Sequence, residues 1–276
     1  MSVDKGIESH WAQGDVYALV LSALQKAGKS LDGLTVEDLA PIDHFHARGL
    51  ASTVDLADCL PIRPGDHVLD IGCGLGGPAR YFAKRFGCRV SGVDITGPFV
   101  DAANKLTDLV GMTGQVSTRK GDALHLPYDD ETFDAAYSQH VTMNIPDRPR
   151  FFAEAFRVLK PGAHFGLTEH GLGPAGSPYH PVPWSEDGTG EWLATPEQTE
   201  QGLAGAGFVD IEIEHTGPKY AAAYQTVTAA AERGELPSLG VHLLLGGNAL
   251  EKTRNSKRNI EEERTQPVQV ICRKPG

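Results

Sequence analysis

A short glycine-rich segment, VLDIGCGLGGPARYF from residue 68, carries residue types that could hold a cofactor. Gly72, Gly74 and Gly77 fit the G-x-G-x-x-G spacing of loops that bind dinucleotides. The segment also fits a second pattern, D-x-G-x-G-x-G, which begins at Asp70. Both patterns predict a tight turn at which the backbone lies close to a ligand. They differ in the ligand that they favour.

Asp70 distinguishes the two patterns, because it places a carboxylate two residues before the first glycine. A dinucleotide brings a diphosphate to this turn, and like charges about 4 Å apart repel by about 4 kcal/mol at an effective dielectric constant of about 20. S-adenosylmethionine carries no phosphate, and its ammonium and sulfonium groups are both cationic. The residue therefore favours S-adenosylmethionine over a nicotinamide dinucleotide. In the alternative interpretation, Asp70 only caps the glycine turn.

Two more carboxylates follow later apolar stretches. Asp94 lies about twenty residues after Gly72, where an acid binds a ribose hydroxyl in either cofactor. Asp122, within Gly121-Asp122-Ala123, is placed to accept a hydrogen bond from an adenine amine. The alternative for Asp122 is a turn residue that bonds its own backbone.

These residues need a sheet to bring them together, and short apolar stretches do alternate with helical patterns along the chain. The expected strands are residues 67–71, 89–94, 115–120, 133–138, 164–169, 208–215 and 267–274. The alternation predicts an α/β fold with a doubly wound, Rossmann-like, seven-stranded and mostly parallel sheet. Ligands of such sheets bind beyond the carboxyl ends of the strands, at the switch point of the strand order. We therefore expect one site beside the glycine loop.

Three regions are expected. Residues 1–60 form an amino-terminal helical lid, and residues 61–216 form the core that binds the cofactor. Residues 217–276 form a helical insertion followed by the final core strand. The insertion is interpreted as a wall of the site, although its helices suit the surface of a homodimer equally well.

Several motifs together resemble class I S-adenosylmethionine-dependent methyltransferases: the glycine loop, Asp94, Gly121-Asp122, LPYDDETFDAAYS and RVLKPG. The resemblance implies S-adenosyl-L-methionine as the cofactor. The residues that it implies as cofactor contacts are Asp70, Gly72, Cys73, Gly74, Gly76, Asp94, Ile95, Asp122, Ala123 and Gln139. The resemblance covers roughly residues 60–215.

The flanking segments DHFHARG and SQHVTMNIPDR look similar to the sarcosine/dimethylglycine N-methyltransferase-like small-molecule enzymes. This similarity implies N-methylation of a small amine or amino acid as the first choice. O- or C-methylation of a specialised metabolite is the alternative within the class. Outside the class, the alternatives are an NAD-dependent oxidoreductase and a protein that binds S-adenosylmethionine without turnover.

The acceptor should lie beside the segment after the fourth expected strand. His140 is the candidate base, because histidine titrates near neutral pH; the alternative is a wall residue. The segment Ser177–Trp192 is rich in aromatic residues and proline, and forms either a desolvated pocket or the anchor of a long loop. The predicted acceptor contacts are Tyr179, Trp184, Trp192, Asn144 and His170. Glu169 and His170 end the fifth expected strand and are expected to face the same crevice; the alternative is a solvated strand end.

Composition excludes other classes. The net charge of −11 disfavours a nucleic-acid partner, and no apolar run is long enough to cross a bilayer. The amino-terminal stretch MSVDKGIESHWAQGD lacks a secretory pattern, and the four cysteines form no C-x-x-C pair, so we expect free thiols and a cytoplasmic location. His44 and His46 form an H-x-H pair without an evident third ligand, so no metal is predicted.

Overall fold

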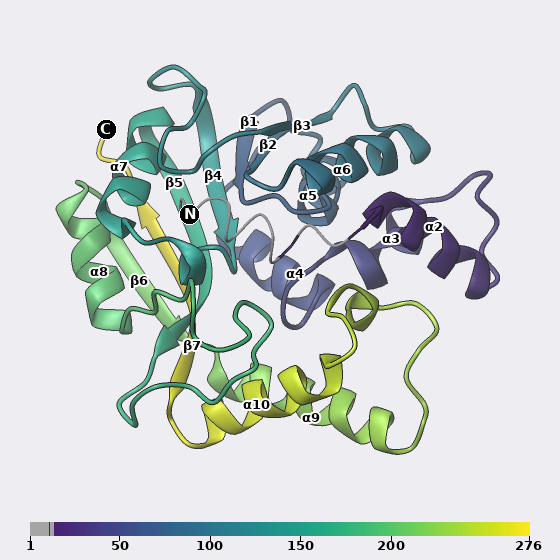
Figure 1. The fold of residues 1–276 in the computed structure, drawn as a ribbon. Coiled ribbons are helices and arrows are strands. Elements are labelled where there is room, and N and C mark those ends of the chain that lie inside the picture. Colours follow the sequence, from purple (N-terminus) through teal and green to yellow (C-terminus); the bar gives the residue numbers. More distant parts are fainter. Residues whose placement is uncertain (1–10, 12–13) are drawn as a thin grey trace.

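Seven strands form one sheet in the computed structural model, which describes residue 11 and residues 14–276 (Figure 1). The strand order is β3-β2-β1-β4-β5-β7-β6; the pairs from β3 to β5 are parallel, and β7 is antiparallel to both β5 and β6. The strands are β1 His67–Ile71, β2 Arg89–Asp94, β3 Val116–Lys120, β4 Phe133–Gln139, β5 Leu159–Leu172, β6 Val209–His215 and β7 Thr265–Arg273. The predicted mostly parallel, seven-stranded sheet is confirmed.

Helices cover both faces of the sheet and its carboxyl edge (Figure 1). Their bounds are α2 Val16–Lys26, α3 Val36–Asp43, α4 Leu50–Cys59, α5 Gly77–Phe86, α6 Gly97–Leu109, α7 Arg148–Val158, α8 Pro196–Gly205, α9 Gly217–Glu232 and α10 Ala249–Glu261. Two short 3₁₀ helices are η1 Thr142–Asn144 and η2 Val241–Leu244.

The central strands are buried on both faces, as parallel strands covered by helices must be. Because side chains alternate along a strand, successive residues of β1 enter different clusters. Val68 packs in one cluster with Leu56 of α4 and Phe82 of α5, whereas Leu69 packs in another with Phe151 of α7. The sheet is thereby fixed between two helical layers.

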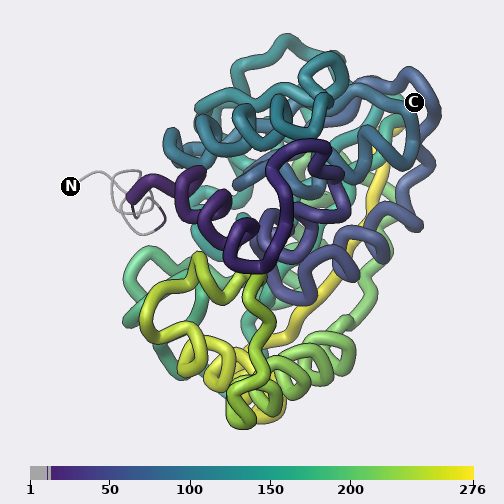
Figure 2. Tube along the Cα trace, turned by 90° about the vertical axis from the view of Figure 1, so that its right-hand side faces the viewer, coloured from purple at the N-terminus to yellow at the C-terminus, as the bar shows by residue number. Residues whose placement is uncertain are grey.

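The chain order reverses at β1, which pairs with β2 on one side and with β4 on the other. The segments that follow β1 and β4 therefore lie at the switch point, where ligands of such sheets bind. Helices α9 and α10 pack together beyond this edge, and α3 packs on η2 (Figures 1 and 2). The amino-terminal helices and the insertion thus meet over the switch point.

Strand β5 begins at Leu159 rather than at the expected residue 164, because it includes the Pro161-Gly162 dipeptide, whose residue types are typical of a turn. Leu159 already pairs with Phe133, and the register shifts before the regular ladder begins at Ala135 and His164. Gly162 lies in this irregular stretch with φ +79°. The Pro-Gly dipeptide therefore produces a shift of register within β5 and does not end the preceding segment in a separate turn.

Two helices begin and end at residues whose types favour helix caps. Thr195 begins α8 with a capping box, in which its side chain and that of Gln198 each accept from the other's backbone N–H. Helix α5 ends at Gly87, which has φ +64°. Both features were expected from the residue types.

The domain boundaries at residues 60 and 216 remain predictions. Most of the amino-terminal stretch that lacks a secretory pattern, residues 1–10 and 12–13, lies outside the described residues. All four cysteines are free thiols, as expected. In the part of the chain that the structure describes, no helix is both long and apolar enough to span a bilayer.

Candidate functional site

A cavity of about 130 Å³ lies at the carboxyl ends of β1, β2 and β4, and we call it the glycine-loop cavity. Its walls come from the glycine loop, the segments that follow β2, β3 and β4, and the amino-terminal region. The lining residues are Trp11, Phe45, Gly72, Gly74, Val93, Asp94, Ile95, Thr96, Phe99, Gly121, Asp122, Ala123, Leu124, Gln139, His140, Val141, Asn144, Ile145 and Pro146. The cavity therefore occupies the place expected for a cofactor.

The first three backbone donors of the glycine loop, those of Gly72, Cys73 and Gly74, are already used within the protein. The N–H groups of Gly72 and Cys73 both donate to the Val93 carbonyl, at 2.7 and 3.0 Å. The N–H of Gly74 donates to Asp94 Oδ2 at 2.8 Å. A phosphate-binding loop needs such groups free to donate to the ligand. This loop therefore supplies shape rather than anion-binding donors.

The first turn of α5 is covered by the end of α3. A Cβ atom at Gly77 would lie 2.5 Å from the carbonyl oxygen of Asp43 and 2.6 Å from its Oδ1. A carboxylate thus lies against the helix N-terminus, where a dinucleotide would place its diphosphate. The third glycine of the dinucleotide pattern is explained by this close packing and needs no phosphate.

The charges around the glycine-loop cavity are negative. Asp94 and Asp122 line it, and the described lining residues include neither lysine nor arginine. Asp94 accepts from the N–H groups of Gly74 and Thr96, both at 2.8 Å, while burial raises its pKa. Asp122 Oδ1 accepts from the Leu124 N–H at 2.8 Å, so it does cap its own turn. A site of this kind suits a cationic ligand with hydroxyl groups.

Asp70 lies behind the loop rather than in the wall of the cavity. It is 2% exposed, and its Oδ2 accepts from the Tyr137 hydroxyl at 3.0 Å. Burial raises its pKa to about 8. The expected direct contact between its carboxylate and a cationic ligand is therefore not seen in this arrangement.

Gln139 presents an amide to the glycine-loop cavity from the end of β4. Its Oε1 accepts from Thr53 Oγ1 at 3.1 Å, whereas its buried Nε2 has no hydrogen-bond partner. Buried donors are nearly always paired in native proteins, so this amide is suited to a ligand acceptor. Thr53 Oγ1 also lies 2.9 Å from His44 Nδ1. Gln139 is thereby linked, through Thr53, to the amino-terminal region.

A second, larger cavity of about 510 Å³ lies between the amino-terminal region and the insertion, and we call it the insertion cavity. Its lining residues are Trp11, Pro41, Phe45, His46, Ala47, Arg48, Gly49, His140, Met143, His170, Pro183, Trp184, Ala223, Tyr224, Thr226, Val227, Leu236, Pro237, Leu239, Gly240, Val241, His242, Leu245 and Thr253. Its size falls within the range of about 300–1,000 Å³ typical of small-molecule sites.

The two cavities meet at Trp11, Phe45 and His140, which line both of them. The Trp11 and Phe45 rings are in edge contact, with centroids 5.5 Å apart. His140 has φ +57°, an unusual conformation for a residue other than glycine, and its ring stacks on His46 at 5.6 Å. A ligand in one cavity can therefore reach a ligand in the other beside His140.

His140 is held as a neutral imidazole. Its Nε2 lies 2.8 Å from the Tyr220 hydroxyl, and Tyr220 is itself buried against Ser52 at 3.0 Å. Burial, together with nearby His170 and His46, lowers the pKa of His140 well below its usual value. A neutral imidazole retains a lone pair that can accept a hydrogen bond or a proton.

Comparison with known proteins agrees with this geometry. Residues 69–167 match the family described as "Methyltransferase domain". The core of this chain is a methyltransferase domain. The predicted family resemblance is thereby confirmed, with the seven-stranded sheet arranged around the matched residues.

Two curated relatives extend the comparison. Sterol 24-C-methyltransferase erg6 of Schizosaccharomyces pombe is 38% identical over 114 residues, which are 41% of this chain and 30% of the relative. Phosphoethanolamine N-methyltransferase of Triticum aestivum is 30% identical over 187 residues, which are 68% of this chain and 36% of the relative. The chain spans about a third of the length of the curated relatives that it matches.

A solved structure of a putative sarcosine dimethylglycine methyltransferase from Galdieria sulphuraria is also similar. Its TM-score is 0.65 at 18% sequence identity, and the match covers 82% of this chain and 84% of that chain. At this identity the likeness shows the fold alone.

The methyltransferase domain brings most of the expected cofactor residues to one cavity. Those that line the glycine-loop cavity are Gly72, Gly74, Asp94, Ile95, Asp122, Ala123 and Gln139. Asp70, Cys73 and Gly76 do not line it. Cys73 instead packs on Gly92, where a Cβ atom would lie 2.7 Å from the Cys73 sulfur.

The expected acceptor residues are divided between three places. Trp184 and His170 line the insertion cavity, with ring centroids 4.8 Å apart. Asn144 lines the glycine-loop cavity, and its Nδ2 donates to the Trp184 carbonyl at 3.1 Å. Tyr179 and Trp192 line neither cavity.

The contacts of the two remaining aromatic residues favour the anchor interpretation of their loop. The Tyr179 ring lies 3.7 Å from the Arg258 guanidinium, and its backbone N–H donates to Asn259 of α10. The Trp192 N–H donates to the Met143 carbonyl at 2.8 Å. These residues fasten the loop that carries Trp184 into the insertion cavity.

Glu169 was expected to face the same crevice as His170, but successive side chains of a strand point to opposite faces. Glu169 is 1% exposed and accepts from Arg148 at 2.8 Å and from Thr199 at 2.6 Å. It joins β5 to α7 and α8 on the face away from His170. The expectation that both residues share one face is therefore corrected.

Sequence reasoning missed several residues that line the insertion cavity or contact its histidines. Phe45 and His46 were read as part of a lid, without an assigned contact. Tyr220 and Tyr224 lie four residues apart on α9 and face the histidines, and Tyr224 Oη lies 3.3 Å from His170 Nε2. Their spacing on an alanine-rich helix is the one signal that could have identified them.

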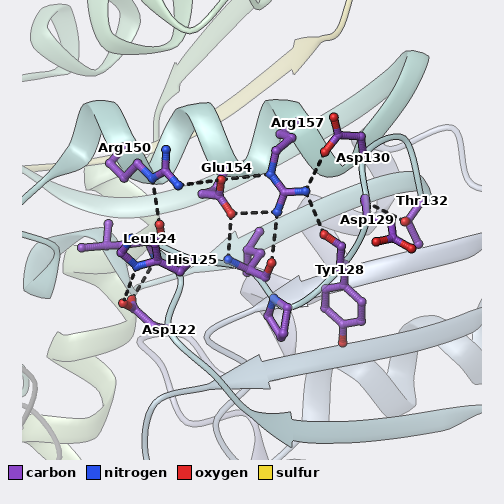
Figure 3. Close-up of polar contacts among 12 residues, drawn as sticks. Asp122, Leu124, His125, Tyr128, Asp129, Asp130, Thr132, Arg150, Glu154 and Arg157 are labelled. Carbon is purple, nitrogen blue, oxygen red and sulfur yellow. Dashed lines mark hydrogen bonds and ion pairs between the residues drawn. The ribbon is translucent and has the colours of Figure 1, made fainter.

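Two charged side chains of α7 hold the segment that carries Asp122 and Ala123 (Figure 3). Glu154 accepts from the Leu126 N–H at 2.8 Å, and Arg157 donates to the Tyr128 carbonyl at 2.8 Å. The two side chains also pair with each other at 2.8 Å, which lowers the pKa of Glu154 and raises that of Arg157. These hydrogen bonds hold residues 122–132 of the methyltransferase domain against α7.

Replacing Arg157 with methionine is expected to destabilise the fold by roughly 3 kcal/mol, because charged hydrogen bonds to buried carbonyl groups are lost. Cofactor affinity should fall by about tenfold, which equals about 1.4 kcal/mol, because the segment that carries Asp122 loosens. Calorimetric titration and thermal unfolding measure the two effects. Arg254→Met is the control: Arg254 of α10 is 51% exposed, pairs with the exposed Glu232 and should contribute less than about 1 kcal/mol. Equal effects of the two changes would contradict this account.

Proposed function

We propose that the chain is an S-adenosylmethionine-dependent methyltransferase that acts on a small molecule. The observation that carries the proposal is the glycine loop: its N–H groups donate to Val93 and Asp94, and Asp43 covers the helix N-terminus. These features leave no anion site for a diphosphate, which disfavours the NAD-dependent alternative. The methyltransferase domain over residues 69–167 supports the same conclusion.

The residues present fit this cofactor. Asp94 keeps lone pairs for ribose hydroxyls beyond the two N–H groups that it accepts, and Asp122, which lines the same cavity, would accept from the adenine amine. The unpaired Nε2 of Gln139 supplies a donor on the same wall. When bound, S-adenosylmethionine supplies an electrophilic methyl group on a cationic sulfur.

The junction of the two cavities is where the acceptor atom would lie. Trp11 and Phe45 exclude water there, and the walls hold two ligands close together, which favours an in-line displacement. An amine acceptor must arrive unprotonated. A hydroxyl or carbon acceptor must lose a proton, and the neutral imidazole of His140 is placed to receive it.

N-methylation is the first candidate, because the chain is related to a phosphoethanolamine N-methyltransferase. C- or O-methylation of a specialised metabolite is the second candidate, because sterol 24-C-methyltransferases match the same core. Detection of S-adenosylhomocysteine with acceptors of each kind tests the choice. Cofactor binding without any product would instead support the binding protein that lacks turnover.

We expect His140→Asn to lower kcat by about a hundredfold with little change in KM, the effect of removing a general base. Asparagine tolerates the positive φ of this position, so the backbone should be retained. Because the pKa of His140 is well below its usual value, its base form persists as the pH falls. Wild-type kcat should therefore show no loss between about pH 8 and pH 6 from this group. A variant within about fivefold of wild type would make His140 a wall residue.

A cytoplasmic enzyme without a nucleic-acid partner is the further part of this proposal, and the net charge of −11 supports it. Homodimer formation through the insertion remains a prediction. We propose no metal requirement; within the described residues, no group of three or more histidine, cysteine or acidic side chains is placed to hold an ion.

A further inference from the structure

Methyl transfer to a small amine does not explain why the lining of the insertion cavity is largely apolar. Its walls from the insertion are mainly aliphatic, including Val227, Leu236, Leu239, Val241 and Leu245. The volume of about 510 Å³ exceeds what a small amine or amino acid would need to be enclosed. The cavity is therefore shaped for a larger, mainly apolar body.

The entrance of the cavity is apolar as well. Val227 is 40% exposed and Leu236 is 37% exposed, and both line this cavity. Large exposed apolar side chains that gather at one opening mark a binding surface. The two exposed side chains that the insertion contributes to the cavity wall are thus apolar.

The described lining residues of the cavity offer no counter-charge for a cationic acceptor. None of its described lining residues is acidic, so a buried ammonium group would find no counter-charge. Its one arginine, Arg48, already pairs with Asp55 at 2.9 Å and lies 5.4 Å from the Tyr220 ring. Because this pairing offsets the charge of Arg48, the arginine gives the cavity little net charge with which to bind a phosphate.

Three uncharged polar side chains of the cavity lie together beside the junction. His140 and His170 lie 5.3 Å apart, and Tyr224 contacts His170. His170 Nδ1 is buried and has no hydrogen-bond partner. These side chains can hydrogen-bond a single neutral polar group beside the junction, while the rest of the cavity encloses apolar surface.

We infer that the acceptor is an uncharged, mainly apolar metabolite of drug-like size, with one neutral polar group at the methylated end. The insertion selects it by apolar enclosure, whether the accepting atom is nitrogen, oxygen or carbon. This inference rests on the proposed function, since it names the substrate class of the same site. It disfavours sarcosine and phosphoethanolamine as acceptors of this chain.

The test uses the uncharged fluorophore N-phenyl-1-naphthylamine as the probe, titrated into the full chain. We expect saturable binding that is weakened by about tenfold in the Val227→Asp, Leu236→Asp double variant, a loss of about 1.4 kcal/mol. Val209→Asp is the matched control, because Val209 is 36% exposed on β6 and does not line the cavity. Sarcosine and phosphoethanolamine should not displace the probe.

Absence of saturable binding, an equal loss in Val209→Asp, or displacement of the probe by micromolar sarcosine or phosphoethanolamine would overturn the inference. S-adenosylhomocysteine is titrated into the same variants by calorimetry. If it binds and the probe does not, the acceptor class is wrong and the proposed function stands. If the probe binds and S-adenosylhomocysteine does not, the proposed function fails instead.

Discussion

Replacing Gly72 with alanine is expected to weaken S-adenosylmethionine binding by about a hundredfold, or about 2.7 kcal/mol. The added Cβ atom would lie 2.1 Å from Val141 Cγ2, far inside van der Waals contact. Gly72 also has φ +81°, which costs an alanine about 1–2 kcal/mol. Both residues line the glycine-loop cavity, so relief of the clash must move the loop or push Val141 into the ligand's space.

Two further variants separate these causes. Gly111 has φ +69° with nothing near its Cβ position, so Gly111→Ala should cost about 1–2 kcal/mol of stability and leave binding unchanged. Adding Val141→Ala to Gly72→Ala should restore part of the lost affinity, because it removes the clash but not the strained φ. Wild-type affinity in a folded Gly72→Ala protein, measured by calorimetric titration, would contradict the assigned role of the loop.

The second large effect is expected at the buried ion pair between α3 and α5. Asp43→Asn should destabilise the protein by about 3–5 kcal/mol, because the fully buried guanidinium of Arg80 loses its counter-charge at 2.9 Å. The midpoint of thermal unfolding should fall by roughly 10 °C. Cofactor affinity should fall too, since Arg80 also donates to the Leu75 carbonyl of the glycine loop at 2.6 Å.

The same two helices supply the control. Lys84 of α5 pairs with Glu37 of α3 at 2.6 Å, but the side chains are 51% and 64% exposed. Lys84→Met should therefore cost less than about 1 kcal/mol. Burial raises the pKa of Asp43 while Arg80 opposes that shift. If Asp43→Asn proves as stable as wild type, the carboxyl group is protonated and the pair is not ionic.

The sequence alone predicted the sheet because its signals are local. Apolar stretches, glycines with positive φ and the Thr195 capping box each follow from neighbouring residues, and they set the order and bounds of most elements. The extent of β5 was missed because pairing with β4, a long-range contact, extends the strand through a Pro-Gly dipeptide.

The residues of the candidate site likewise fall into those that local signals predict and those that depend on long-range contacts. Asp94, Asp122 and Gln139 follow directly from strand ends, and the sheet brings them to one cavity. The place of Asp70 depends on Tyr137 of β4, a partner 67 positions away, and no local pattern reveals it. The insertion cavity likewise combines α9 and η2 with the amino-terminal segment, so its apolar character appears only in three dimensions.

The most direct test of the central claim is a calorimetric titration of the wild-type chain with S-adenosylhomocysteine and, separately, with NAD. We expect one S-adenosylhomocysteine site per chain, lost in Gly72→Ala, and no binding of NAD. Binding of NAD in place of S-adenosylhomocysteine would mean that the glycine loop binds a diphosphate, although Asp43 lies beside it and its N–H groups donate to Val93 and Asp94. The proposed methyl-transfer function would then be contradicted.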